Sequence, residues 1–141
     1  MAHDEKVELL SRVGPLQGCS AAQLRTIARH AELTGILAGT VAIDEGAEAR
    51  EVFLIVRGEA DVSRGGRAVA SLRPGDYFGE VGVLSSQRRD ARVTARTNLE
   101  VLIFGRREFL ALLATIPALN RSVLGTLASR LHHSQVAQLA V

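Results

Sequence analysis

From residue 33 to residue 104, the sequence is a series of short β-rich runs separated by glycine. The runs alternate apolar and polar residues or form brief apolar bursts, at 40–43, 52–56, 60–63, 68–72, 92–95 and 101–104. Glycine occurs between them, and Gly65-Gly66 suits a two-residue hairpin turn because glycine accepts positive φ. Many short strands with glycine turns predict an antiparallel sandwich or barrel.

The N-terminal part of the chain carries a helical pattern instead. Residues 4–13 hold apolar side chains at roughly helical spacing, and Gly14-Pro15 breaks that segment. Ser20 is predicted to cap a second short helix, with Gln23 in the capping-box position. One face of that helix is expected to carry Leu24, Ile27, Ala28 and Ala31.

The helical pattern returns after Arg106. A short helix is expected to contain Phe109, Leu110, Leu112 and Leu113, and Pro117 opens another. The apolar stripe of the last helix consists of Leu119, Val123, Leu127 and Leu131. Such a stripe packs on the roll or forms a dimer seam.

Together these patterns predict an α+β fold, an antiparallel β-roll of the jelly-roll (double-stranded β-helix) type with helices at both ends. We expect one domain over residues 1–141, with a helical segment at about 4–32, the roll at about 33–104 and C-terminal helices at about 106–138.

Composition narrows the function. A single cysteine, Cys19, excludes an internal disulfide, and the polar start carries no signal-peptide stretch, so a cytoplasmic location is expected. The net charge is only +2, and aromatic residues make up 4% with no tryptophan. Neither a basic face nor a base-stacking platform is evident, and no apolar run reaches the roughly 18 residues of a membrane span. Nucleic acid and membrane are therefore not expected as partners.

One stretch, residues 74–93, combines features of an anion site. A short apolar burst follows Gly79, and a helical turn opening there presents unpaired backbone N–H groups. Gly79 and Gly82 let the backbone approach a ligand, and Arg89 can hold two phosphate oxygens at once. Glu80 is a carboxylate beside this site, which makes sense if it accepts hydrogen bonds from a sugar hydroxyl.

The stretch resembles the phosphate-binding cassette of cyclic-nucleotide-binding domains, found in the catabolite activator protein, the regulatory subunits of cyclic-AMP-dependent kinase and cyclic-nucleotide-gated channels. The family pattern is Phe-Gly-Glu, three or four apolar residues, a variable loop, then Arg and small residues. This chain supplies Phe78-Gly79-Glu80, the apolar 81–84, then Arg89, Ala91 and Val93. Upstream residues that also fit include Val41, Ile43, Gly46, Phe53, Ile55, Gly58, Val62 and 72–76, so the resemblance covers about residues 5–131.

The resemblance implies a regulatory sensor that binds cyclic AMP or cyclic GMP, catalyses nothing and needs no metal or other cofactor. Glu80 would bind the ribose 2′-hydroxyl and Arg89 the cyclic phosphate. Arg130, in the last helix, would close over the base as a cation–π partner. The expected ligand contacts are Gly79, Glu80, Val81, Gly82, Arg89, Asp90, Ala91 and Arg130.

Three positions depart from the family pattern: Arg88 replaces a frequent proline, Asp90 a small residue, and Arg92 a frequent threonine. A carboxylate at Asp90 repels a phosphate unless it turns away or pairs with Arg88 or Arg92. In the family, threonine directly after the phosphate arginine favours cyclic GMP, and its absence here favours cyclic AMP. A carboxylate could nevertheless accept hydrogen bonds from guanine, so cyclic GMP stays open.

Three other functions compete with the sensor. A family member that has lost its ligand would serve as a docking or dimerisation module, with an effector protein or a second copy as partner. A metal-dependent roll enzyme needs histidines on strands, whereas all four lie in helical or terminal segments: His3, His30, His132 and His133. A DNA-binding regulator needs a winged helix after residue 131, where about ten residues remain.

Overall fold

The computed structural model describes residues 3–85 and 88–137, with the side chains of Glu80, Val81, Ser85 and 130–137 among those not described. Three short helices precede the first strand: α1 (His3–Ser11), the 3₁₀ turn η1 (Gly14–Leu16) and α2 (Ala21–Arg29). Ser20 caps α2 as predicted, because its hydroxyl accepts from the Gln23 N–H over 3.1 Å and the Gln23 side chain accepts from the Ser20 N–H over 2.9 Å.

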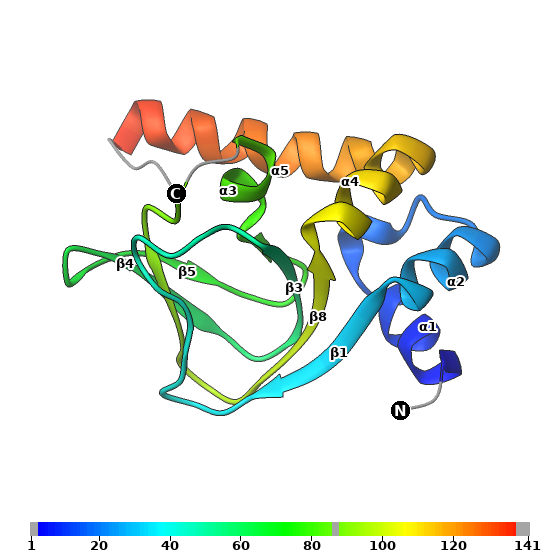
Figure 1. The fold of residues 1–141 in the computed structure, drawn as a ribbon, viewed down its shortest axis with the longest axis horizontal. Coiled ribbons are helices and arrows are strands. Elements are labelled where there is room, and N and C mark those ends of the chain that lie inside the picture. The colour runs from blue at the N-terminus through cyan, green and yellow to red at the C-terminus, as the bar shows by residue number, and fades with distance from the viewer. Residues whose placement is uncertain (1–2, 86–87, 138–141) are drawn as a thin grey trace.

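In the described part of the chain, eight strands form two antiparallel four-stranded sheets, which confirms the predicted β-roll with flanking helices (Figure 1). One sheet has the order β1-β8-β3-β6 and the other β2-β7-β4-β5. Their bounds are β1 Ala31–Ile36, β2 Val41–Ile43, β3 Glu51–Arg57, β4 Ala60–Arg64, β5 Arg67–Leu72, β6 Tyr77–Phe78, β7 Arg92–Ala95 and β8 Leu99–Gly105.

The expectation for Ala31 was wrong. Ala31 is the first residue of β1, not part of the apolar face of α2, which ends at Arg29. It pairs with Phe104 in β8, and long-range pairing of this kind overrides a local helical pattern. The Gly65-Gly66 hairpin has the expected geometry, with φ of +57° and +78° between β4 and β5.

Strand β3 separates two hydrophobic clusters. Val52 and Leu54 face the cluster formed with the helices, whereas Phe53 and Ile55 belong to the cluster inside the roll. Successive side chains of a strand point to opposite faces, so a strand covered on both faces is apolar throughout. The five-residue apolar run at 52–56 is therefore the strand that separates the two clusters.

The C-terminal helices are α4 (Arg106–Thr115) and α5 (Pro117–Ala137). Figure 1 shows α5 as a long helix running past the short helix α3 (Glu80–Ser85) at one end of the roll. Of the predicted apolar stripe, Leu119 and Val123 are buried in the helix-side cluster and Leu127 is partly buried against it, while the Leu131 side chain lies outside the described part. Among the described residues no single helix is long and apolar enough to cross a membrane, and only α4 with part of α5 passes as a pair bent by 112°.

Candidate functional site

The predicted cassette is one continuous piece of structure. Strand β6 ends at Phe78, whose ring stacks on Phe53 with centroids 4.6 Å apart. Gly79 then turns the chain at φ +87°, and α3 begins at Glu80. The chain re-enters the roll at Arg92, the first residue of β7. Tyr77 and Phe78 are both buried, and packing of Phe78 in the roll fixes where the glycine turn lies.

Arg89 is the buried charged residue among the described residues, with 8% of its surface exposed. Its guanidinium donates from Nη1 to the Gly79 carbonyl oxygen over 2.5 Å and from Nη2 to the Glu51 carbonyl oxygen over 2.6 Å. The side chain thus joins the start of the cassette to the first residue of β3. Arg89 is therefore a buried link between two main-chain segments and not a solvent-exposed surface arginine.

The main chain of Arg89 is held as firmly as its side chain. Its carbonyl accepts from the Gly46 N–H over 2.8 Å, and its N–H donates to the Ala47 carbonyl over 2.9 Å. These two bonds attach the cassette loop to the loop between β2 and β3. An arginine fixed at both ends loses little further conformational freedom when it binds a ligand.

Gly79 leaves no room for a side chain. A Cβ there would lie 2.9 Å from Arg89 Nη1, 2.9 Å from the Glu51 carbonyl oxygen and 3.2 Å from Ile43 Cδ1. Both its positive φ and this crowding require glycine. The close approach of the guanidinium to the cassette backbone therefore depends on this residue.

Asp90 is exposed and turns away from Arg89. Its carboxylate pairs with Arg64, whose Nη2 lies 3.3 Å from Oδ2, and Arg64 Nε donates to the Asp90 carbonyl over 3.1 Å. Of the two expected alternatives, the carboxylate turns away, and its ion pair is with Arg64 and not with Arg88 or Arg92, because both of these are engaged on the β2–β3 loop. Their bonds are Arg88 Nη1 to the Gly46 carbonyl over 3.0 Å and Arg92 Nε to Asp44 Oδ1 over 2.9 Å.

The remaining predicted contacts divide into two groups. Gly82 is buried in α3, and Ala91, at 7% exposed, packs in the cluster inside the roll. The side chains of Glu80, Val81 and Arg130 lie outside the described residues, and their roles stay predictions. The structure therefore brings Gly79, Arg89 and the backbone around them together.

Two components of the site were missed by the sequence analysis. The Glu51 carbonyl carries no sequence signal, because every residue has one. Arg64 was missed because it lies 26 residues before Asp90. The sequence does contain a glycine, Gly46, in the β2–β3 loop that meets Arg89. Its φ of +80° permits the turn there, but it does not identify Glu51 or Arg64.

The cassette is also joined to the last helix. The Tyr77 hydroxyl lies 3.3 Å from the Ser122 hydroxyl of α5, and Tyr77 is fully buried. Because Tyr77 is two residues before Gly79, this contact connects the start of the cassette to α5.

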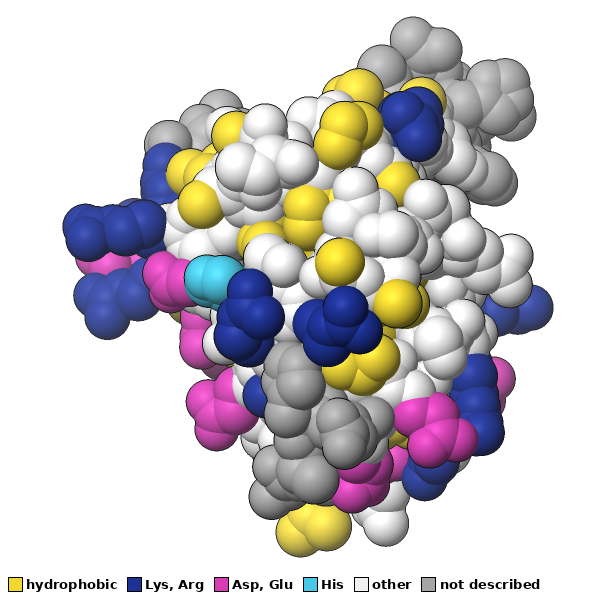
Figure 2. Space-filling model, turned by 90° about the vertical axis from the view of Figure 1, so that its right-hand side faces the viewer, with side chains coloured by type: hydrophobic (Ala, Val, Ile, Leu, Met, Phe, Trp, Pro, Cys, Tyr) yellow, Lys and Arg dark blue, Asp and Glu magenta, His cyan; other side chains and the backbone are white. Residues whose placement is uncertain are grey.

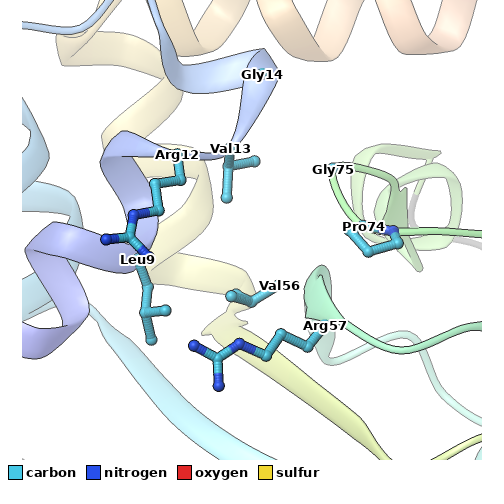
Figure 3. Close-up of a pocket in the computed structure, with 8 residues that line it drawn as sticks. All are labelled: Leu9, Arg12, Val13, Gly14, Val56, Arg57, Pro74 and Gly75. Carbon is cyan, nitrogen blue, oxygen red and sulfur yellow. The ribbon is translucent and has the colours of Figure 1, made fainter.

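Other chemistry-bearing features do not involve Gly79 or Arg89. A cavity of about 140 Å³ is lined on one side by Leu9 of α1 and by Arg12, Val13 and Gly14 after it, and on the opposite side by Pro74 and Gly75 (Figure 3). Its arginines are ion-paired, Arg12 with Glu8 and Arg57 with Glu100. Burial raises the pKa of the Cys19 thiol, as suits a packing residue. Within residues 3–85 and 88–137, no cluster of His, Cys, Asp and Glu could hold a metal ion.

The surface shown in Figure 2 carries both signs of charge. Lys and Arg side chains are interspersed with Asp and Glu, and hydrophobic side chains lie scattered between them. A mixed surface of this kind is typical of a solvated face.

Comparison with known proteins agrees with this geometry. Residues 35–116 match the family model described as a cyclic nucleotide-binding domain. The cAMP-dependent protein kinase regulatory subunit of Yarrowia lipolytica is 42% identical over 80 residues, covering 55% of this chain and 21% of that protein. The chain thus spans about a fifth of the length of that relative.

Solved structures share the fold. The structure of cAMP-bound PfPKA-R (141-441) superposes with a TM-score of 0.85 at 22% identity, covering 99% of this chain and 48% of that one. The catabolite activator protein of Thermus thermophilus gives a TM-score of 0.78 at 24% identity, covering 88% of this chain and 61% of that one.

Proposed function

The chain belongs to the cyclic nucleotide-binding domain family, and from this premise we propose that it binds cyclic AMP in preference to cyclic GMP. Residues 1–141 act as one such domain and as a regulatory sensor that catalyses no reaction. The site is the cassette around Gly79, Glu80 and Arg89. Its output is closure of the C-terminal helix, α5.

The observation that carries the proposal is the placement of Arg89. The guanidinium of Arg89, a residue with 8% of its surface exposed, is held against the carbonyls of Gly79 and Glu51, directly beside the cassette backbone. A cyclic phosphate arriving there forms charge-assisted hydrogen bonds, which are roughly twice as strong as neutral ones. Glu80 then binds the ribose 2′-hydroxyl, in the role that the family pattern implies.

The preference for cyclic AMP rests on the residue after Arg89. A threonine there favours cyclic GMP in the family, and this chain has Asp90, whose carboxylate is bound by Arg64. The matching relative from Yarrowia lipolytica is itself named as a cAMP-dependent regulatory subunit, which supports the same choice.

The proposed output uses the contact between Tyr77 and Ser122. Ligand binding organises the cassette, the buried Tyr77 transmits the change to α5, and α5 closes over the base with Arg130 stacked on it. The effector is a separate protein or a second copy of the chain, met in the cytoplasm.

Calorimetric titration of the protein, refolded from denaturant to remove bound nucleotide, tests the proposal. We expect one cyclic AMP per chain and weaker binding of cyclic GMP. Arg89→Ala should lose about 2–5 kcal/mol of binding free energy because the phosphate is left unpaired. Arg89→Lys keeps the charge but loses the bidentate geometry, so it should bind with intermediate affinity.

Arg88→Ala is the matched control, since Arg88 is the neighbouring arginine, is exposed and binds only the Gly46 carbonyl among the described contacts. It should keep near-wild-type affinity. If folded wild-type protein binds neither nucleotide, the sensor proposal fails and a docking module takes its place.

A further inference from the structure

One arginine holds both the backbone and the side chain of the residue after Arg89. Arg64, the last residue of β4, donates to the Asp90 carbonyl over 3.1 Å and to its carboxylate over 3.3 Å. The α-carbons of Arg89 and Asp90 are neighbours about 3.8 Å apart, so the carboxylate begins within reach of the anion site. The direction in which the Asp90 carboxylate is held therefore decides how strongly it repels a bound anion.

We propose that Arg64 is a positioning residue for the phosphate site, which keeps the Asp90 carboxylate on the outer side of the cassette and offsets its charge. The inference rests on the proposed function. Arg89 is directed inward, with 8% of its surface exposed, whereas the Asp90 side chain is 60% exposed and lies against Arg64. The chain thus tolerates a carboxylate beside its phosphate arginine because a third residue restrains it.

Arg64 is itself fixed by its surroundings. The next residue, Gly65, donates its N–H to Glu45 Oε1 over 3.1 Å, which ties the tip of the β4–β5 hairpin to the β2–β3 loop. That loop also receives the side chain of Arg92 through Asp44. The neighbouring basic residues are therefore engaged elsewhere, and the ion pair that the described residues give Asp90 is the one with Arg64.

The effect of Arg64 on binding is electrostatic and indirect. An exposed ion pair contributes little to stability, so removing Arg64 should leave the fold intact. It should release the Asp90 carboxylate, whose repulsion of a phosphate several ångströms away through water is on the order of 3- to 10-fold in affinity. That repulsion is screened by salt, because the screening length falls to about 3 Å at 1 M ionic strength.

Cyclic AMP titrations of four folded proteins test this inference: wild type, Arg64→Ala, the double variant Arg64→Ala/Asp90→Ala, and Arg57→Ala. Arg57 is the matched control, since it is an exposed strand arginine in a surface ion pair with Glu100 at 2.9 Å. We expect Arg64→Ala to bind on the order of 3- to 10-fold more weakly than wild type at low salt, and the ratio to shrink at high salt. The double variant should return to within about 2-fold of wild type.

The outcomes separate this inference from the proposed function. If wild type does not bind cyclic AMP, the proposed function fails and the inference with it. If wild type binds and Arg64→Ala binds equally well, the inference alone is overturned. A loss in Arg64→Ala that the second substitution does not rescue, or an equal loss in Arg57→Ala, also overturns it, because restraint of Asp90 would not then be the cause.

Discussion

The Arg89 guanidinium contacts the Gly79 main chain so closely that the two residues form one unit. Nη1 of Arg89 donates to the Gly79 carbonyl over 2.5 Å, and a Cβ on Gly79 would lie 2.9 Å from the same nitrogen. The position of the guanidinium and the absence of a side chain at the start of the cassette therefore depend on each other geometrically.

Substituting Gly79 with alanine should destabilise the protein for two reasons. The φ of +87° costs an L-residue about 1–2 kcal/mol. The new Cβ would also meet the Glu51 carbonyl oxygen at 2.9 Å, and a backbone atom in a β-strand cannot move aside cheaply. Urea unfolding of the ligand-free protein measures the total loss.

Gly39→Ala provides the control for the backbone strain alone. Gly39 has the same φ of +87° and nothing within 4 Å of an added Cβ. We expect Gly79→Ala to lose at least about 1 kcal/mol more than Gly39→Ala, from crowding. Equal losses would show that the neighbours of Gly79 move away and that the crowding is not a constraint.

Arg89→Ala should destabilise the protein even without ligand. The substitution removes the donors that reach the carbonyls of Gly79 and Glu51, and each buried acceptor left with a poorer partner costs about 1–3 kcal/mol. The urea midpoint should fall clearly, while exposed Arg88→Ala should change stability by about 0.5 kcal/mol or less. If both variants unfold at the wild-type midpoint, Arg89 has no structural role.

The hydrogen bond between Tyr77 and Ser122 should couple the cassette to α5. Tyr77→Phe removes the hydroxyl and should cost about 0.5–1.5 kcal/mol, since Tyr77 is fully buried. A double-variant cycle with Ser122→Ala measures the coupling, and urea unfolding supplies the free energies. Strictly additive losses would mean that the two hydroxyls do not interact in solution.

Acid should weaken the protein in part through Asp61. Its hydrogen bond with Arg96, which donates from Nε to Oδ1 over 3.0 Å, holds the pKa of that carboxyl below its ordinary value. A lowered folded-state pKa gives stability that is fully present above the unfolded pKa of about 3.9 and is lost as the pH falls through the folded value.

Thermal unfolding of wild type and Asp61→Asn between pH 2 and pH 6 measures this loss of stability. The pH range brackets the ordinary carboxyl pKa of about 3.9. The variant should show a flatter acid limb, and high salt should reduce the difference because the pair is exposed. Parallel curves would assign the acid sensitivity to other carboxylates, of which Asp44, whose pKa is lowered by its hydrogen bond from Arg92, is the next to substitute.

The parts of the fold that the sequence predicts well are those set by local chemistry. The cap at Ser20 and the Gly65-Gly66 turn depend on residues next to each other, and both occur as expected. The strand β1 was harder, because its sequence Ala-Glu-Leu-Thr-Gly-Ile is poor in strand formers and its strand character comes from pairing with β8. The two-residue strand β6 is too short to show any period.

The residues of the candidate site also divide into those that the local sequence predicts and those that only the folded chain brings together. Gly79 and Arg89 belong to one motif of adjacent segments, so a single sequence reveals them. The acceptor at Glu51 is a main-chain oxygen, and the partner of Asp90 is an arginine on another strand, Arg64. Neither can be found until the chain is folded, because only the strand order brings them beside the cassette.

Strand β3 gives the site a consequence for folding. Its first residue, Glu51, receives Arg89, and the side chains that follow face the helix-side cluster and the interior of the roll in turn, with Val52 and Phe53 the first of each. Because β3 contributes side chains to both clusters, unfolding of one cluster removes packing from the other. The domain should therefore unfold as a single cooperative unit, and nucleotide held at Arg89 should slow amide hydrogen exchange in both clusters together.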